Sequence, residues 1–162
     1  MKRIIIHWTA GTYTVTEQDK EHYHFIVNGV GVVEKGDHDV EDNLSTADGD
    51  YAAHTLGCNK DSIGISMACM AGAIEAPFNA GKYPMKPVQI ESLAAKVAEL
   101  AKRYKIPVTP QTILTHAEVQ PTLGIKQRGK WDVTRIPFMP NLIGHKACGD
   151  FIRERVKEAL EG

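Results

Sequence analysis

The sequence predicts an α/β fold, built as a single domain with a central, mostly mixed β-sheet flanked by helices. Short β-branched runs alternate with segments of helical periodicity, which is typical of this fold class. No linker or internal repeat divides the chain, and 162 residues suit one compact domain with a sizeable core. We therefore expect one domain over residues 1–162.

The individual elements follow from local patterns. Runs rich in β-branched and aromatic residues predict strands at 3–8, 22–27, 30–35, 62–70 and 112–115. The pair Asn28-Gly29 predicts a tight hairpin turn between the second and third strands. Helices are expected at 17–21 behind a Thr16 cap, from Pro87 to Lys105, and from about 141 to 160. The acidic stretch 36–51 and the Gly/Pro-rich stretch 71–87 are expected to be loops.

Composition excludes several classes of protein. The 19 basic residues are balanced by 20 acidic ones, so a nucleic-acid partner held by a strong positive field is not expected. The three cysteines form no CxxC pair, which argues against a disulfide framework and favours a reducing compartment. No secretory signal or membrane-spanning run is visible, so we expect synthesis in the cytoplasm and no membrane partner. A monomer is the default expectation.

Two histidines and one carboxylate are placed where they could bind a metal. His7 ends the first strand, His116 directly follows the TILT strand, and Asp132 lies in the loop between Gly129 and Pro137. Two imidazoles and one carboxylate can supply three ligands to zinc and leave a fourth position for water or substrate, which is the arrangement of a catalytic site. Each histidine taken alone is more often structural than a ligand.

The ordered segments IIIHWTAG, YHFIV, NKDSIGISM, THAEV and KWD resemble those of the zinc-dependent N-acetylmuramoyl-L-alanine amidases. That family includes phage lysozyme-type amidases, muropeptide-recycling amidases and peptidoglycan recognition proteins. The resemblance runs from about Arg3 to Pro137 and implies hydrolysis of the amide between N-acetylmuramic acid and L-alanine of peptidoglycan. It also implies that His7, His116 and Asp132 bind Zn²⁺, with aspartate in the place of the cysteine found in some relatives.

The resemblance also implies catalytic roles for two residues. Lys130, two positions before Asp132, would stabilise the oxyanion of the tetrahedral intermediate. One branch of the family positions water with a glutamate in the SIGIE segment, but this chain has Ser66 there. Other branches use a tyrosine in the YHF segment, so Tyr23 is assigned the water-positioning role. A half-buried strand tyrosine with a hydrogen-bonded hydroxyl is the structural alternative.

The remaining polar residues allow several interpretations. His54 and Asn59 precede a strand that lines the substrate groove in relatives, so they are expected to contact substrate. Trp8 could stack on a sugar face or pack in the core. Glu118 could orient a ligand imidazole or form a surface salt bridge. His24 alternates with Tyr23 along a strand and is expected to be a buried, hydrogen-bonded histidine.

Cys58 and Cys69 are expected to be buried thiols in or near the core.

Three hypotheses for function remain open at this stage. The first is a zinc amidase, acting either as a phage or prophage endolysin on the cell wall or as a cytoplasmic enzyme that recycles muropeptides. Tyr23 and the small size of the chain favour the endolysin. The second is a module that binds peptidoglycan without cutting it, and the third is an α/β domain whose histidines are structural.

Overall fold

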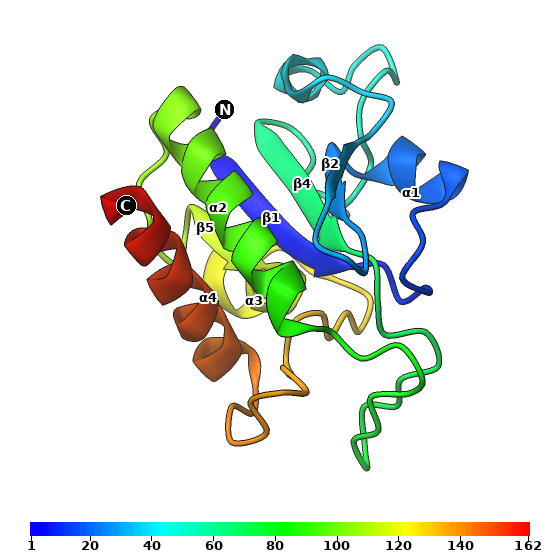
Figure 1. Cartoon of the computed structure of the whole chain (residues 1–162). Coiled ribbons are helices and arrows are strands. Elements are labelled where there is room, and N and C mark those ends of the chain that lie inside the picture. The colour runs from blue at the N-terminus through cyan, green and yellow to red at the C-terminus, as the bar shows by residue number, and fades with distance from the viewer.

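A computed structural model describes all residues, 1–162, and confirms the α/β fold (Figure 1). The five strands form one sheet in the order β3-β2-β4-β1-β5. Only β3 runs antiparallel, against β2, so the sheet is mixed. The strands are β1 (Arg3–Trp8), β2 (Phe25–Val27), β3 (Val33–Lys35), β4 (Ser62–Met67) and β5 (Ile113–Thr115).

Helices surround this sheet. The two longest lie side by side over one face of it (Figure 1). A short helix precedes β2, and another begins immediately after β5. The helices are α1 (Glu17–His22), α2 (Pro87–Tyr104), α3 (His116–Leu123) and α4 (His145–Glu161), with a 3-10 helix, η1, at Val40–Leu44. None of them combines the length and apolar character that crossing a membrane would require.

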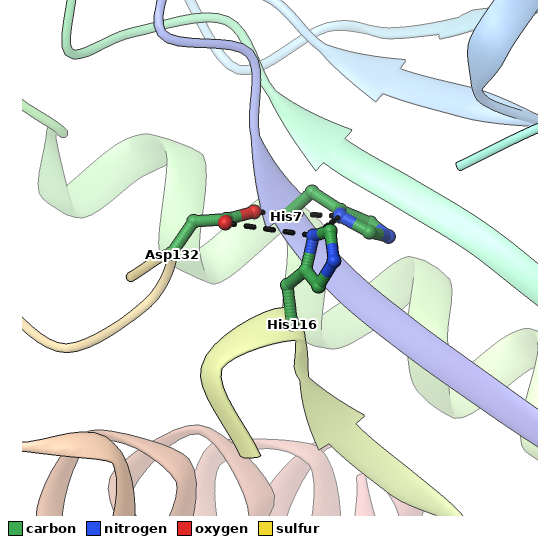
Figure 2. A group of neighbouring side chains, drawn as sticks. All are labelled: His7, His116 and Asp132. Carbon is green, nitrogen blue, oxygen red and sulfur yellow. Dashed lines mark hydrogen bonds and ion pairs between the residues drawn. The ribbon is translucent and has the colours of Figure 1, made fainter. Parts of the chain in front are cut away.

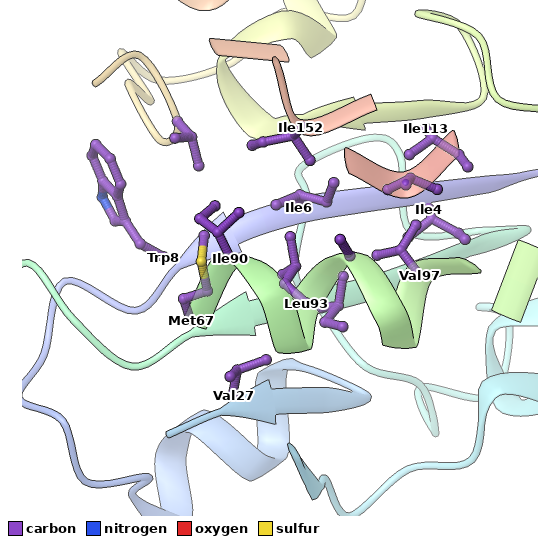
Figure 3. Close-up of a cluster of buried hydrophobic side chains, with 14 of the residues drawn as sticks. Ile4, Ile6, Trp8, Val27, Met67, Ile90, Leu93, Val97, Ile113 and Ile152 are labelled. Carbon is purple, nitrogen blue, oxygen red and sulfur yellow. The ribbon is translucent and has the colours of Figure 1, made fainter. Parts of the chain in front are cut away.

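The side chains of β1 alternate between the large apolar core on one face of the sheet and a smaller cluster on the other face. Successive residues of a strand point to opposite faces. Ile4, Ile6 and Trp8 therefore share the large apolar core beneath α2 and α4, which Figure 3 shows. Ile5 points the other way, into a smaller cluster with Cys58 and Leu114. His7 shares the alternation of Ile5, so its ring lies on the face away from the two long helices.

Helix α3 was not predicted, and this is the main difference from the sequence analysis. Its capping box is nevertheless present in the sequence: the N–H of Thr115 donates to the Glu118 carboxylate at 3.0 Å. Pro121 lies inside the helix, where proline normally argues against helical structure. Only eight residues long, the helix depends on tertiary packing more than on its own propensity.

Other boundaries differ by a few residues. The hairpin strands are shorter than predicted, β4 ends at Met67, and α4 begins at His145 rather than near Asn141. The stretch predicted as an acidic loop contains η1. The Thr16 cap is confirmed, and the structure adds reciprocal hydrogen bonds with Asp19 that make it a capping box. The burial of Cys58 and Cys69 as free thiols is also confirmed.

Candidate metal centre

Strand register brings the two predicted histidine ligands together. Strands β1 and β5 are parallel neighbours, and Ile6 pairs with Thr115. His7 is the next residue on one strand, and His116 directly follows the other. Both imidazoles therefore lie at the carboxyl ends of adjacent parallel strands, where open α/β sheets place their sites.

The third predicted ligand arrives on a loop that is tied to α3. The backbone N–H of Ala117 donates to the carbonyl of Asp132 at 2.6 Å, which holds the loop against the first turn of the helix. Figure 2 shows the three side chains converging. The Nδ1 atoms of His7 and His116 are 3.0 Å apart, and they lie 3.3 and 3.5 Å from the carboxylate oxygens of Asp132.

Burial determines the charge of these groups. All three side chains are nearly inaccessible to solvent. Burial lowers the pKa of His7 to about 4, although the nearby Asp132 carboxylate opposes this shift. Burial alone would raise the pKa of Asp132, but its interactions with the two histidines hold it below its usual value. At neutral pH the group therefore offers a neutral His7 imidazole and an ionised carboxylate.

The donor set fits zinc. The outer Nε2 of His116 lies 2.9 Å from Oε1 of Gln127, and the outer Nε2 of His7 lies 3.4 Å from the hydroxyl of Thr55. Ring nitrogens that bond outward leave their inner Nδ1 atoms as ligands. Two imidazole nitrogens and a carboxylate oxygen within 4.8 Å of one another match the ligands that zinc takes in catalytic sites.

This group lies at a cleft of about 760 Å³. Seven of the eight residues that were predicted to act in the site line it: Trp8, Tyr23, His54, Asn59, His116, Lys130 and Asp132. His7 is not part of the lining; its buried ring lies against the rings of Tyr23 and His116. The topology thus brings side chains that are up to 124 positions apart (8 to 132) to a single depression of the surface.

The two predicted catalytic residues line the same cleft as His116 and Asp132 and come from different segments of the chain. The ring of Tyr23 is 5.1 Å from the ring of His7, measured between centroids. Burial, and then the negative charge of Asp132, raise the pKa of Tyr23, so its hydroxyl stays protonated at neutral pH. Lys130 lies exposed on the loop that carries Asp132 and faces the cleft.

His54 is more deeply placed than a typical substrate contact. Its Nδ1 is 2.8 Å from the Thr55 hydroxyl, and its Nε2 is 3.3 Å from the carbonyl of Ser62. Its ring packs against the backbone of Gly64, where a Cβ would come within 2.4 Å of it. Asn59 accepts the backbone N–H groups of His54 and Thr55 through its side-chain oxygen.

His24 is the buried, hydrogen-bonded histidine that was predicted. Its side chain is inaccessible to solvent. Nδ1 accepts the backbone N–H of Gly64 at 3.0 Å, and Nε2 donates to Oδ1 of Asn43 at 3.0 Å.

Of the two roles predicted for Glu118, the salt bridge is confirmed, but it is buried rather than on the surface. The carboxylate pairs with Arg153 of α4 and makes no hydrogen bond to a ligand imidazole. Gly149 of α4 makes the approach feasible, since a Cβ there would lie 2.1 Å from the Glu118 carboxylate.

Sequence reasoning also missed four residues of the site. Trp131 packs edge-on against Trp8, with ring centroids 4.8 Å apart, and both line the cleft. Arg128 adds a second cation to the wall that carries Lys130. Gln127 and Thr55 contact the outer nitrogens of the two histidines. The KWD segment placed Trp131 beside a ligand, but nothing in the local sequence marked the other three.

Comparisons with known proteins agree with this geometry. Residues 1–148 match the N-acetylmuramoyl-L-alanine amidase family. The fold is similar to that of the N-acetylmuramoyl-L-alanine amidase LysC from Clostridium intestinale, with a TM-score of 0.54 at 18% identity over 96% of this chain and 85% of that one. Comparison with curated protein sequences finds no match.

Two further solved structures are more distant. The amidase AmiD from E. coli, solved with anhydro-N-acetylmuramic acid-L-Ala-D-gamma-Glu-L-Lys, has a TM-score of 0.48 at 21% identity over 72% of this chain and 48% of that one. Bumblebee PGRP-SA has a TM-score of 0.49 at 16% identity over 76% and 74%. Because the family match spans nearly the whole sequence, this protein belongs to the N-acetylmuramoyl-L-alanine amidase family.

Proposed function

We propose that this protein is a zinc-dependent amidase that cleaves the bond between N-acetylmuramic acid and L-alanine of peptidoglycan, as a single catalytic domain over residues 1–162. The observation that carries the proposal is the convergence of His7, His116 and Asp132 on one point, where His116 and Asp132 line a large cleft. A buried pair of imidazoles beside a buried carboxylate is the ligand set of a zinc hydrolase.

When bound there, zinc supplies a Lewis acid that polarises a carbonyl and lowers the pKa of a bound water to about 7. The protein provides the rest. Attack on the amide carbon creates an oxyanion, and Lys130 is the proposed donor that stabilises it. The Lys130 side chain lies exposed on the cleft wall, on the same loop as Asp132, so it can reach a carbonyl held over the metal centre.

Tyr23 is the proposed water-positioning residue. Its ring is adjacent to that of His7, and its raised pKa keeps the hydroxyl able to donate or accept a hydrogen bond without ionising. Ser66, at the position where one branch of the family carries glutamate, pairs with His7 across the sheet. Its hydroxyl is buried without a partner and cannot replace a carboxylate base. The tyrosine route therefore fits this chain better.

The lining of the cleft suits a substrate that carries sugar and acidic peptide. Trp131 offers indole surface at one wall, packed edge-on against the buried Trp8, while Arg128 and Lys130 add positive charge. Asp132 is the only carboxylate in the lining. Trp8, Asn59 and His54 stay the proposed substrate contacts. For His54 any contact would use the ring edge, because both nitrogens are engaged with protein groups.

For the biological role we propose a phage or prophage endolysin, which acts on the cell wall after release from the cytoplasm. The place of Tyr23 in the cleft supports this choice. The alternative is a cytoplasmic amidase that recycles muropeptides. Activity on intact sacculi but not on soluble muropeptides would support the endolysin, and the reverse preference would identify the recycling enzyme.

The amidase proposal itself is tested by digesting purified peptidoglycan with and without a chelator and labelling the new amino termini. New N-terminal alanine that disappears with chelator and returns with added zinc is the expected result. His116→Ala should abolish it. A protein that binds muramyl peptides and zinc but exposes no alanine from either sacculi or muropeptides would instead be a binding module.

A further inference from the structure

Two separate chains of hydrogen bonds lead away from the metal centre, and each ends on a backbone carbonyl. One runs from His116 through Gln127 to the carbonyl of Leu56. The other runs from His7 through Thr55 and His54 to the carbonyl of Ser62. A backbone carbonyl can only accept a hydrogen bond, so the direction of every bond in each chain follows from its last member.

The chain through Gln127 has one consistent arrangement. The carbonyl of Leu56 lies 2.7 Å from Nε2 of Gln127, which must be the amide donor. Oε1 of Gln127 therefore faces Nε2 of His116 at 2.9 Å and can only accept. The proton of His116 must then lie on Nε2, which leaves the Nδ1 lone pair directed at His7 and Asp132.

The chain through Thr55 gives the same result for the second histidine. Nε2 of His54 faces the Ser62 carbonyl and must carry the proton, so its Nδ1 accepts from the Thr55 hydroxyl. Because the Thr55 hydroxyl donates its proton to His54, it can only be an acceptor toward Nε2 of His7, which lies 3.4 Å away. Nε2 of His7 must therefore carry the proton. The Nδ1 of His7 is again left as a lone pair facing the same point.

Both chains are built into the fold. Gln127 is buried, and its own backbone N–H donates to Oε1 of Gln120 on α3 at 2.9 Å. The His54 ring fits only because position 64 is glycine. Two Nδ1 lone pairs held 3.0 Å apart beside a carboxylate repel one another, and a cation between them removes that repulsion.

We propose that Gln127 and the Thr55–His54 pair are positioning residues that set the tautomers of both histidines before metal binds. The inference rests on the proposed zinc site. Outer hydrogen bonds of this kind are generally worth about 10- to 100-fold in metal affinity. His54 then orients His7 through Thr55, in addition to lining the cleft.

The test measures zinc affinity by competition with a chromophoric chelator for the wild type, Gln127→Leu and Thr55→Val. Both variants should bind zinc about 10- to 100-fold more weakly. Gln127→Glu, which keeps an acceptor opposite His116, should recover part of the affinity lost in Gln127→Leu. In the cobalt-substituted protein, the visible absorption bands of the two weakened variants should shift.

Gln89→Leu is the matched control. Gln89 is also a fully buried glutamine whose amide donates to backbone carbonyls, including that of Ala68 at 2.9 Å, but it touches none of the three metal-binding candidates. It should lower the unfolding free energy of the metal-free protein and leave zinc affinity unchanged.

The outcomes separate the two proposals. A wild type that binds no zinc would overturn the metal centre, and this inference with it. A wild type that binds zinc, with Gln127→Leu and Thr55→Val binding it as tightly, would overturn the positioning role alone. The two variants lie on separate chains, so the failure of one to fold leaves the other to decide.

Discussion

Arg153 and Glu118 form a buried, two-pronged ion pair between α4 and α3. Nη1 of Arg153 donates to Oε1 of Glu118 and Nη2 donates to Oε2, both at 2.9 Å. Arg153 also donates to the carbonyl of Ile113 in β5 at 3.0 Å. Glu118 caps the helix whose first residue is His116, so the pair anchors the segment that carries a metal-binding candidate.

Arg153 lies beyond residue 148, where the family match ends. The C-terminal helix thus supports the site although it contributes no side chain to the lining of the cleft. The charges of the Glu118 carboxylate and the Arg153 guanidinium compensate each other, and both side chains are almost inaccessible to solvent.

We expect Arg153→Met to destabilise the protein strongly. Removing one partner leaves the Glu118 carboxylate buried and uncompensated, which typically costs about 3–5 kcal/mol. Urea unfolding of the metal-free protein measures this loss. The control is Lys35→Met, which breaks the exposed pair between Lys35 and Asp39 and should change the unfolding free energy far less, because solvent screens this pair. Equal losses in the two variants would contradict the anchoring role.

Local sequence patterns were sufficient to predict the candidate site residues that lie at the ends of regular strands. His7 was predictable because a β-branched run with strand periodicity stops at it, and parallel pairing then places it beside the residue after β5. Asp132 and Lys130 were predictable only as members of an ordered set of segments shared with a family.

The rest of the site depends on contacts between distant segments. Glu118 pairs with Arg153, which is 35 positions away in the sequence. Gln127 bonds to the carbonyl of Leu56, which is 71 positions away. A glutamine in a polar loop has no periodicity or spacing that marks it as a buried amide. Helix α3 escaped prediction for a related reason, since its stability comes from packing against α4 and β5 rather than from its own short sequence.

Lys130→Met should lower kcat about 10²- to 10³-fold, as expected for loss of a donor to the oxyanion. Zinc content should be unchanged, because the ammonium group is not a metal ligand. Lys126→Met is the control, since Lys126 is exposed on the same loop but does not line the cleft. Steady-state hydrolysis of a muramyl peptide measures both. A Lys130→Met enzyme with nearly full kcat would remove Lys130 from the mechanism.

Tyr23→Phe should lower kcat about 10²-fold or more while zinc remains bound, because the variant keeps the ring beside His7 and loses only the hydroxyl. Tyr104→Phe, at the end of α2, removes a hydroxyl that bonds to Glu41 and should leave kcat unchanged. Activity assays together with elemental analysis for zinc separate the two effects. Full activity in Tyr23→Phe would show that another group positions the water.

The burial of His24 should make stability depend on pH. Burial lowers its pKa to about 4 from 6.5, despite the hydrogen bond to Asn43. Between these two pH values the unfolded chain binds more protons at His24 than the folded protein does. The stabilisation that neutral His24 provides is therefore fully present above about pH 6.5 and is lost as pH falls towards 4. A shift of this size corresponds to about 3 kcal/mol.

Replacing His24 with glutamine isolates this contribution. His24→Gln should be less stable than the wild type at pH 7, because the N–H of Gly64 loses its acceptor. Between pH 7 and 4.5, however, it should lose less unfolding free energy than the wild type does. Urea titrations of both metal-free proteins at the two pH values give the difference. The same loss in both would mean that protonation of His24 does not drive the acid sensitivity of the fold, and that other buried histidines, such as His54, carry it instead.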